Sequence, residues 1–537
     1  MPSFGPDRWS KWAPLLLALI SIGALIFFDL QTTLARNDDW IYAWAVRHST
    51  FAHPRLWPYQ SIGLPQVWWG LILTAPAHDP RLLRLSIVPF VILTAYASYR
   101  IARMVGADAF WSSVAATALL TSPVFMSVSA TFMTDTFFVG VLIAAAWQGL
   151  RWIDSGRGWI LCTALTAIAC MQRPVGVGLT AALTVTLALP PGPNLVGHRQ
   201  WSKLAVHWLV VAFALAMPGL VGAGSTTNFT SFLPGGELAN RVTTLTYLPA
   251  MLGLLLLPFG LAFATRHDRA VKMPPATIAK RMAFRTSIAL AAVAVAAFVV
   301  NPWTFFPGDI WLASGLGGPF LSHGQAHFYP VGVYVSISLL AVGTVVALLV
   351  LSRWPYTIGS LGKAGVFLAL LAAAEFAPLM LIGTAHPVFD RYFLPVAAPL
   401  IPLAAALISG QRGWSGAWAL GALAVGLLLW TTGEQHYIEA SAAIDHAASL
   451  AYAVAPPAEV DAGYEENAVR FEVPYYDSTG RLPPHAGDPR LDPALTGPHD
   501  PSVILAWGDA TDSRPGVDFG SLAPAKVVLV VRPKPGG

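Results

Sequence analysis

The sequence predicts an all-α polytopic membrane protein with about thirteen transmembrane helices, followed by a small C-terminal soluble α/β domain. Three observations predict it. Hydrophobic residues make up 55% of the 537 residues and charged residues only 11%, whereas soluble proteins carry about 25% charged residues. The mean hydropathy is +0.58. The apolar residues also come in blocks close to the ~20 residues that a helix needs to cross the hydrocarbon core.

The expected spans cover most of the first 432 residues. The blocks show little of the polar face that a buried helix of a soluble protein keeps. The first block is too long for the apolar region of a signal peptide, and no small-residue cleavage site follows it, so we interpret it as a span. The spans are expected near residues 12–34, 82–104, 109–126, 132–150, 158–171, 174–190, 204–222, 245–264, 286–301, 329–351, 364–383, 392–409 and 414–432.

The basic residues predict the orientation of the chain. With the N-terminus in the cytoplasm, seventeen Lys and Arg lie in cytoplasmic loops and eight in the opposite loops, as the positive-inside rule requires. These loops account for the net charge of +4, so no nucleic-acid partner is expected. Residues 35–80, residues 301–328 and the C-terminal tail then lie outside the cytoplasm. Because no endoplasmic-reticulum signal is recognisable, we expect a bacterial inner membrane with the tail in the periplasm.

The tail from Gly433 to Gly537 has a different composition from the rest of the chain. It gains Asp, Glu, Pro and Gly and loses the long apolar blocks. Ser502–Trp507 and Ala525–Val531 are short β-like runs bounded by Pro and Gly, and a segment of about 100 residues can fold alone. We therefore divide the chain into a transmembrane domain (1–432) and an extracytoplasmic soluble domain (433–537), in which Pro483–Pro501 is a loop.

The strongest local signal is a pair of carboxylates, Asp38 and Asp39, directly after the first span. Acids beside a membrane are costly to desolvate and tend to be retained for function. The alternative is that they cap the next helix, because Trp40–Val46 has the pattern of a short interfacial amphipathic helix. Both roles are compatible with the sequence.

Three further charged residues lie on the same predicted side of the membrane. Asp135 begins the otherwise apolar fourth span, where it needs a partner or a water-filled cavity unless it caps the helix. Arg173 and Arg391 lie in outer loops, although basic residues prefer the cytoplasmic side. Arginine presents a planar fork that suits phosphate oxygens. The alternatives are a snorkelling side chain for Arg173 and a local salt bridge with Asp390 for Arg391.

The other residues capable of chemistry give weaker signals. Cys162 and Cys170 lie in an apolar stretch and are expected to be small core residues. His323 and His327 have the i,i+4 spacing of helical zinc ligands, but Gly324 disfavours a helix and no Glu lies nearby. No phosphate-binding Gly-rich loop, HExxH motif or dinucleotide-binding turn is present, which argues against an ATP-driven pump and a soluble-type hydrolase.

These motifs, in this order, resemble the GT-C superfamily of membrane glycosyltransferases, in particular its protein O-mannosyltransferase and lipid A aminoarabinose transferase branches. Asp38-Asp39-Trp40-Ile41-Tyr42 is similar to the family's Asp-Glu-x-x-Tyr pattern, and Thr134-Asp135-Thr136 looks like its second acidic site. Gln172-Arg173-Pro174 and Arg391-Tyr392-Phe393-Leu394-Pro395 resemble recurrent family segments. The resemblance covers residues ~12 to ~432 of the predicted spans.

The chain departs from the family at Asp39, which stands where the family has Glu, in the tail, which resembles no family segment, and late in the first loop. Aminoarabinose transferases carry a Glu-Lys-Pro stretch late in the first loop, where this chain has Tyr59–Gln66 without the acid or the lysine. The departure removes the basis for a metal or phosphate contact there and for naming the sugar.

The resemblance implies a glycosyltransferase that moves a sugar from a polyprenyl-phosphate donor to an extracytoplasmic lipid, glycan or protein acceptor, within a shell of membrane lipids. Asp38 would act as the base, with Asp39 and Asp135 as further candidate catalytic acids. Arg173, Arg391, Tyr42 and Tyr392 would bind substrate. The phosphate is a good leaving group, so a divalent metal is optional and no cofactor is certain. The alternatives are a lipid or polysaccharide transporter or flippase, an O-antigen ligase or polymerase, and a non-catalytic scaffold.

Overall fold

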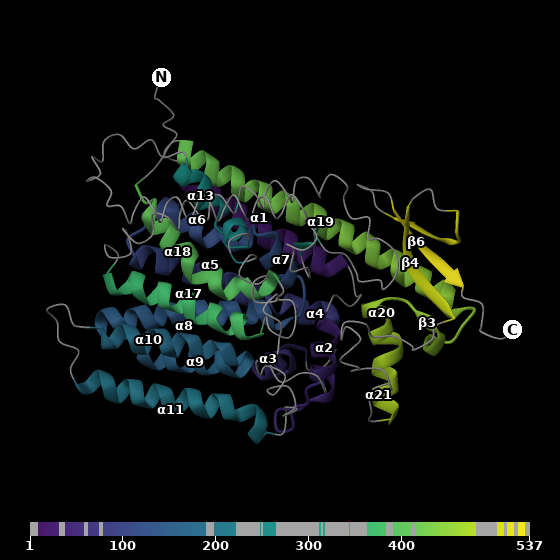
Figure 1. The fold of residues 1–537 in the computed structure, drawn as a ribbon, viewed down its shortest axis with the longest axis horizontal. Coiled ribbons are helices and arrows are strands. Elements are labelled where there is room, and N and C mark those ends of the chain that lie inside the picture. Colours follow the sequence, from purple (N-terminus) through teal and green to yellow (C-terminus); the bar gives the residue numbers. More distant parts are fainter. Residues whose placement is uncertain are drawn as a thin grey trace.

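The computed structural model describes residues 9–31, 38–57, 63–74, 79–189, 198–221, 248, 251–264, 311–312, 315–316, 343, 362–382, 390–410, 414–479, 502–509, 513–519 and 525–531. They form a bundle of α-helices with a small β-sheet at one end (Figure 1).

The elements of this part of the chain are mostly helical. The α-helices are α1 (Trp9–Gln31), α2 (Asp39–His48), α3 (Leu64–Thr74), α4 (Pro80–Leu85), α5 (Val88–Met104), α6 (Ala109–Leu120), α7 (Pro123–Ser129), α8 (Thr134–Ser155), α9 (Trp159–Gln172), α10 (Val177–Ala188), α11 (His198–Leu220), α13 (Leu257–Ala264), α17 (Gly362–Ile382), α18 (Leu394–Leu407), α19 (Trp414–Tyr452), α20 (Tyr464–Asn467) and α21 (Val473–Thr479). The shorter helices are the 3-10 turns η1 (Pro174–Gly176), η6 (Asp390–Phe393) and η7 (Pro457–Glu459) and the π-helical turn η8 (Ala468–Glu472). The strands are β1 (Trp311–Leu312), β2 (Gly315–Leu316), β3 (Val460–Asp461), β4 (Val503–Asp509), β5 (Gly516–Phe519) and β6 (Ala525–Val531).

Seven helical segments among the described residues are long and apolar enough to cross a membrane. They are Trp12–Gln31, Pro80–Met104, Thr134–Ser155, Gln200–Leu220, Gly362–Met380, Asp390–Leu407 and Trp414–Tyr452. Helices α6 and α7, which meet at a bend of 58°, make an eighth if they count as one span. The integral-membrane character of the sequence is thus confirmed.

The count of thirteen spans stays a prediction. The expected spans near 158–171 and 174–190 correspond to α9 and to η1 with α10, which are apolar but shorter helices. The expected spans near 286–301 and 329–351 lie outside the described residues, apart from Gly343. The outer loop 301–328 is described only where β1 and β2 pair antiparallel.

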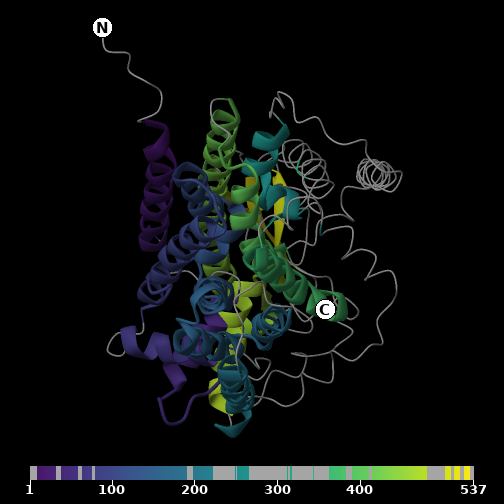
Figure 2. The same ribbon diagram turned by 90° about the vertical axis from the view of Figure 1, so that its left-hand side faces the viewer.

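The spans differ in how deeply they are buried. Within the most apolar 18 residues of each segment, the buried share is 83% in Thr134–Ser155 and in Asp390–Leu407. It is only 33% in Trp12–Gln31 and 22% in Gln200–Leu220. Helices α8 and α18 are therefore central. Helix α1 lies at the edge (Figure 2) and exposes large apolar side chains such as Leu16 and Phe27, which suits contact with lipid.

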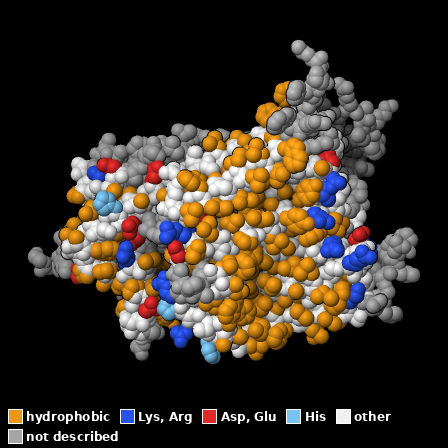
Figure 3. All heavy atoms as spheres, turned by 180° about the vertical axis from the view of Figure 1, so that it is seen from behind, with side chains coloured by type: hydrophobic (Ala, Val, Ile, Leu, Met, Phe, Trp, Pro, Cys, Tyr) orange, Lys and Arg blue, Asp and Glu red, His pale blue; other side chains and the backbone are white. Residues whose placement is uncertain are grey.

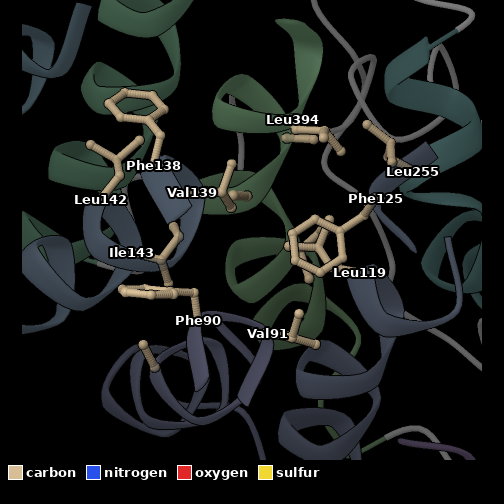
Figure 4. Packing of buried hydrophobic residues seen from close by; sticks show 14 of the residues in the cluster. Phe90, Val91, Leu119, Phe125, Phe138, Val139, Leu142, Ile143, Leu255 and Leu394 are labelled. Carbon is tan, nitrogen blue, oxygen red and sulfur yellow. The ribbon is translucent and has the colours of Figure 1, made fainter. Parts of the chain in front are cut away.

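The core of the bundle is aromatic and aliphatic. Phe90 on α5 and Phe137 on α8 have ring centroids 4.1 Å apart, and Leu394 of α18 lies in the same cluster (Figure 4). Helices α5 and α8 approach closely at Gly140, where an added Cβ would lie 2.8 Å from the carbonyl oxygen of Phe90. Cys162 and Cys170 are buried free thiols, which confirms the prediction for both.

The charges separate toward the two ends of the bundle. Figure 3 shows a band of hydrophobic side chains between an end rich in Lys and Arg and an end of mixed charge. Lys203 and Lys363, both assigned to cytoplasmic loops, donate to the carbonyls of Gly156 and Leu189 at the helix ends remote from the acids. This arrangement agrees with the charge bias of the sequence, while the orientation itself stays a prediction.

The tail begins within a helix. Helix α19 runs for 39 residues from Trp414 to Tyr452, so it continues through the boundary placed at residues 432 and 433. A four-stranded sheet of order β3-β4-β6-β5 packs on its C-terminal half, with β3 and β4 parallel and the other pairs antiparallel. Strands β4 and β6 confirm the two predicted β-runs, whereas Pro483–Pro501 lies outside the described residues.

We expect Gly140→Ala to weaken the contact between α5 and α8, because the new methyl group meets backbone that cannot move aside. Overpacking of this kind costs roughly 1–3 kcal/mol. Thermal unfolding of the purified protein in detergent measures the loss. Gly23→Ala is the matched control, since nothing lies within 4 Å of a Cβ at this exposed helical glycine. Equal melting temperatures for the two variants would contradict the close packing.

Candidate active site

The two adjacent carboxylates of the first loop contact different arginines. Helix α2 begins at Asp39, which confirms the helix expected after the acids. Asp38 is at the N-cap position, but its side chain makes no capping hydrogen bond. Its Oδ2 instead accepts from Arg391 Nη2 at 3.3 Å. Asp39 Oδ2 lies 3.8 Å from Nε of the fully buried Arg84.

Asp135 forms the shortest ion pair at this end of the described bundle. Its Oδ2 lies 2.8 Å from Arg173 Nη2, and the Asp135 side chain is 1% exposed. Helix α8 begins at Thr134 with Met133 at the N-cap, so the alternative that Asp135 is the capping residue is wrong. The carboxylate still lies in the first helical turn, where the helix dipole favours a negative charge.

Arg173 is fixed by more than its carboxylate. It follows the last residue of α9, and its Nε and Nη2 donate to Thr134 Oγ1 at 3.1 and 2.7 Å. Its side chain is only 12% exposed, so it does not snorkel freely toward water. Arg173 therefore bridges the C-terminal end of α9 to the N-terminal turn of α8.

Tyr392 brings the two arginines together. The guanidinium carbon of Arg173 lies 5.5 Å from the centroid of the Tyr392 ring, and that of Arg391 lies 5.6 Å from it. Both distances are in the range of cation–π contacts. Arg391 also donates from Nη1 to Met133 Sδ at 3.4 Å. The two acid–arginine pairs, drawn from residues 38, 135, 173 and 391, thus flank a single aromatic side chain.

The local Asp390–Arg391 contact is made by the backbone. The backbone N–H of Arg391 donates to Asp390 Oδ1 at 2.6 Å, and Asp390 is fully buried. This hydrogen bond lies at the start of η6, ahead of α18, and the guanidinium is directed at Asp38.

Tyr42 lies beside Thr134, at the end of the first turn of α2. Its side chain is 6% exposed and hydrogen bonds with Thr134. Burial raises the pKa of Tyr42 to about 12, against the lowering effects of this hydrogen bond and of the Arg173 charge. The phenol is therefore neutral at physiological pH and serves as a hydrogen-bonding group.

A glycine permits this close packing. Gly63 has a φ of +101°, and a Cβ there would lie 3.0 Å from Tyr42 Cε1 and 3.2 Å from Thr134 Cγ2. Its N–H donates to the carbonyl of Gln172 at 3.1 Å. The start of α3 is thereby held against the end of α9, beside Arg173.

Sequence reasoning missed the amide pair that completes this junction. Gln172 Nε2 donates to Gln66 Oε1 at 2.7 Å, and Gln66 Nε2 donates to the carbonyl of Phe132 at 2.8 Å. Both glutamines are fully buried. A long polar side chain within an apolar stretch was the available signal, because such a group must find partners inside the protein.

Sequence reasoning also missed two buried charged groups. Arg84, the partner of Asp39, is fully buried. Glu375 on α17 is 3% exposed, its Oε1 faces Gly178 on α10, and it interacts electrostatically with Arg173. No hydrogen bond from the described residues reaches either oxygen of Glu375. An acid within an apolar span was the signal for this residue.

The described residues do not form a metal centre. No group of three or more His, Cys, Asp or Glu within them could hold a metal ion, and the acids of the site face guanidinium groups. His323 and His327 lie outside the described residues. In the segment Tyr59–Gln66, where the chain differs from aminoarabinose transferases, Tyr59–Ile62 also lie outside the described residues. Gly63 and Gln66 of the same segment contact Gln172 and join α3 to α9.

We expect Asp135→Asn to destabilise the protein, because it leaves the Arg173 charge without its carboxylate in a nearly water-free place. Breaking a buried pair costs roughly 3–5 kcal/mol. Removing both charges, as in Asp135→Asn with Arg173→Gln, should cost less than the sum of the single changes. Chemical unfolding in detergent measures this cycle.

Asp445→Asn is the control, since its ion pair with Arg470 is exposed and worth at most about 1 kcal/mol. Equal losses for the buried and exposed pairs would contradict the geometry.

We expect Tyr42 to make stability fall at high pH. The folded pKa of about 12 lies above the ordinary tyrosine pKa of 10.0, so the folded state keeps a proton that the unfolded state releases, and stability is lost between pH 10 and 12. A shift of about two pKa units corresponds to roughly 3 kcal/mol. Melting temperatures measured from pH 9 to 12 should fall more steeply for the wild type than for Tyr42→Phe. Parallel curves would show that Tyr42 titrates normally.

The chain is similar, at low sequence identity, to several solved structures. No protein-family model and no curated protein sequence matches the chain. Among solved structures, ArnT from Cupriavidus metallidurans bound to undecaprenyl phosphate is 14% identical, with 96% of this chain and 97% of that chain covered and a TM-score of 0.42. The archaeal oligosaccharyltransferase AglB from Archaeoglobus fulgidus, in complex with an inhibitory peptide and a dolichol-phosphate, is 15% identical, with 93% and 61% covered and a TM-score of 0.45.

Proposed function

We propose that the protein is an inverting glycosyltransferase that moves a sugar from a polyprenyl-phosphate donor to a hydroxyl group of an extracytoplasmic lipid, glycan or protein. The observation that carries the proposal is the convergence of two acid–arginine pairs, Asp38–Arg391 and Asp135–Arg173, around Tyr392 at one end of a bundle of apolar helices. In this reading residues 1–432 are the catalytic part and residues 433–537 a periplasmic domain of a bacterial inner-membrane protein.

The arginines are suited to a phosphate. Each guanidinium offers parallel N–H groups that match phosphate oxygens, and the leaving phosphate gains negative charge in the transition state. The two guanidinium groups share the Tyr392 ring, so one phosphate between them would be held from two sides. The lipid chain of the donor would remain against the exposed apolar side chains of the spans, where water is excluded.

The two acid–arginine pairs differ in their availability to a substrate. The Arg391–Asp38 contact is long, at 3.3 Å, and the Asp38 side chain is 28% exposed. The Arg173–Asp135 contact is short, and Asp135 is 1% exposed. A donor phosphate would therefore compete for Arg391 and free Asp38, while Asp135 keeps Arg173 oriented.

Asp38, once released from Arg391, would be the base. The acceptor hydroxyl oxygen forms a bond to the anomeric carbon as the bond from that carbon to the phosphate oxygen breaks. The hydroxyl proton passes to an Asp38 carboxylate oxygen, and the bonding electron pair leaves with the polyprenyl phosphate beside Arg391 and Arg173. Attack opposite the leaving group inverts the anomeric configuration.

The remaining candidate residues would act on the site without taking a proton. Asp39 is turned toward buried Arg84, so we assign it to holding α2 rather than to proton transfer. The neutral Tyr42 hydrogen bonds with Thr134 and would thereby hold the residue that accepts from Arg173 in place. The mechanism needs no divalent metal, because Asp38, Asp39 and Asp135 each lie beside an arginine.

We expect Asp38→Asn to lower strongly the transfer of a radiolabelled sugar from its polyprenyl phosphate to a membrane-extract acceptor. Loss of a general base lowers turnover by about 10²–10⁴-fold, while the amide keeps the size of the side chain and the protein stays folded. Reconstituted wild type and variant are compared at equal protein levels over a panel of donor sugars. Asp79→Asn is the control, because this acid pairs with exposed Arg81 in the same outer region.

The alternatives predict different outcomes of the same experiment. Full turnover by Asp38→Asn would remove Asp38 from the chemistry. Movement of the lipid-linked sugar across the vesicle, without any product from the whole donor panel, would favour a transporter or flippase. Transfer from a polyprenyl-diphosphate donor alone would favour an O-antigen ligase or polymerase.

A further inference from the structure

The tail reaches back to the helix that begins at the acids. Asp477 on α21 accepts a hydrogen bond from the indole Nε1 of Trp44 on α2 at 2.9 Å, and its Oδ1 lies 3.5 Å from His48 Nε2. The ring centroid of Tyr476 lies 5.5 Å from that of Trp44 and 4.9 Å from that of Trp57. These contacts join residues more than 400 positions apart in the sequence. In Figure 1, α2 and α21 lie at the same end of the bundle.

Helix α2 depends on such contacts for its position. It has only 10 residues, and a helix this short is marginal on its own. Its buried aromatic side chains pack in a cluster in which Trp57 contacts Trp40 and Trp44 at centroid distances of 5.2 and 5.0 Å. Tyr476 closes the same cluster from the tail. Movement of α2 would carry Asp38 and Tyr42 with it, because they lie at its N-terminal end.

The tail can support α2 because it has a hydrophobic core and buried hydrogen bonds of its own. Alanine and isoleucine side chains of the second half of α19 form a core with β3, β4 and β6. After β3, the buried Asn467 donates to Asp461 Oδ1 at 2.8 Å and accepts from the N–H of Ala462 at 2.8 Å. The chain continues from there through η8 into α21. Helix α21 is thus connected through a packed domain to a membrane span.

We propose that Tyr476 and Asp477 are positioning residues of the transfer reaction, through which the soluble tail holds α2 and keeps Asp38 in place to accept the proton. This inference rests on the proposed function. It assigns to the tail a task in the chemistry of the membrane domain, in addition to any contact of its own with an acceptor.

The test compares Tyr476→Ala with Tyr475→Ala. Tyr475 is the adjacent residue of the same type and the same partial exposure, and its ring contacts Phe471 within the tail. A small displacement of a catalytic group lowers turnover by about tenfold to a hundredfold. We expect kcat to fall by this factor in Tyr476→Ala, with the donor KM unchanged, and to stay near the wild-type value in Tyr475→Ala and in the conservative Tyr476→Phe.

One further measurement and one replacement variant keep the inference testable. Backbone hydrogen exchange of residues 39–48 should be faster in Tyr476→Ala than in the wild type and unchanged in Tyr475→Ala. If Tyr476→Ala does not fold, Asp477→Ala replaces it, with Asp477→Asn as the variant that keeps an oxygen to accept from Trp44. Unchanged kcat and unchanged exchange in the folded variants would overturn the inference. Wild-type protein without transfer activity on any donor would instead contradict the proposed function, and the exchange rates would then decide the support of α2 by themselves.

Discussion

The arrangement at the acidic end of the bundle depends on the pairing of buried charges. Asp135 and Arg173 lie where little water reaches them, and an unpaired charge there would cost several kcal/mol. Their ion pair ties the start of α8 to the end of α9, and the hydrogen bonds from Arg173 to Thr134 bring Tyr42 and α2 against the same turn. The central helix α8 is thereby connected to the loop that carries Asp38.

The neighbouring acids lie in different environments, which is the basis of the different roles that we propose for them. Asp38 is partly exposed and makes a long contact with Arg391, whereas Asp39 is buried beside Arg84. A base must be reachable by its substrate and must be able to exchange its partner. A structural anion must be enclosed and fixed. Asp38 precedes α2 and Asp39 begins it, so the two side chains leave the backbone in different directions, one toward Arg391 and the other toward Arg84.

The tail and the membrane domain share elements. Helix α19 belongs to both, because it continues from a span into the core of the four-stranded sheet. Helix α21 then contacts α2 from the opposite direction in the sequence. A segment held at two points has less freedom than one joined by a linker, which is consistent with the positioning role that we propose for the tail.

The amino-acid sequence by itself determined the membrane character, the approximate course of most described spans, the short helix after Asp39, the strands β4 and β6, and the charged residues that converge at the site. These follow from local properties, namely the length of apolar blocks, the alternation of side chains and the cost of placing a charge near lipid. Only the tertiary structure decided that Asp38 faces Arg391, that Asp39 faces Arg84 and that Tyr392 lies between two arginines. It also decided the continuity of α19 and the contact of α21 with α2. The physical reason is that such pairings join residues up to several hundred positions apart, and their geometry is set by how helices pack rather than by any periodicity along the chain.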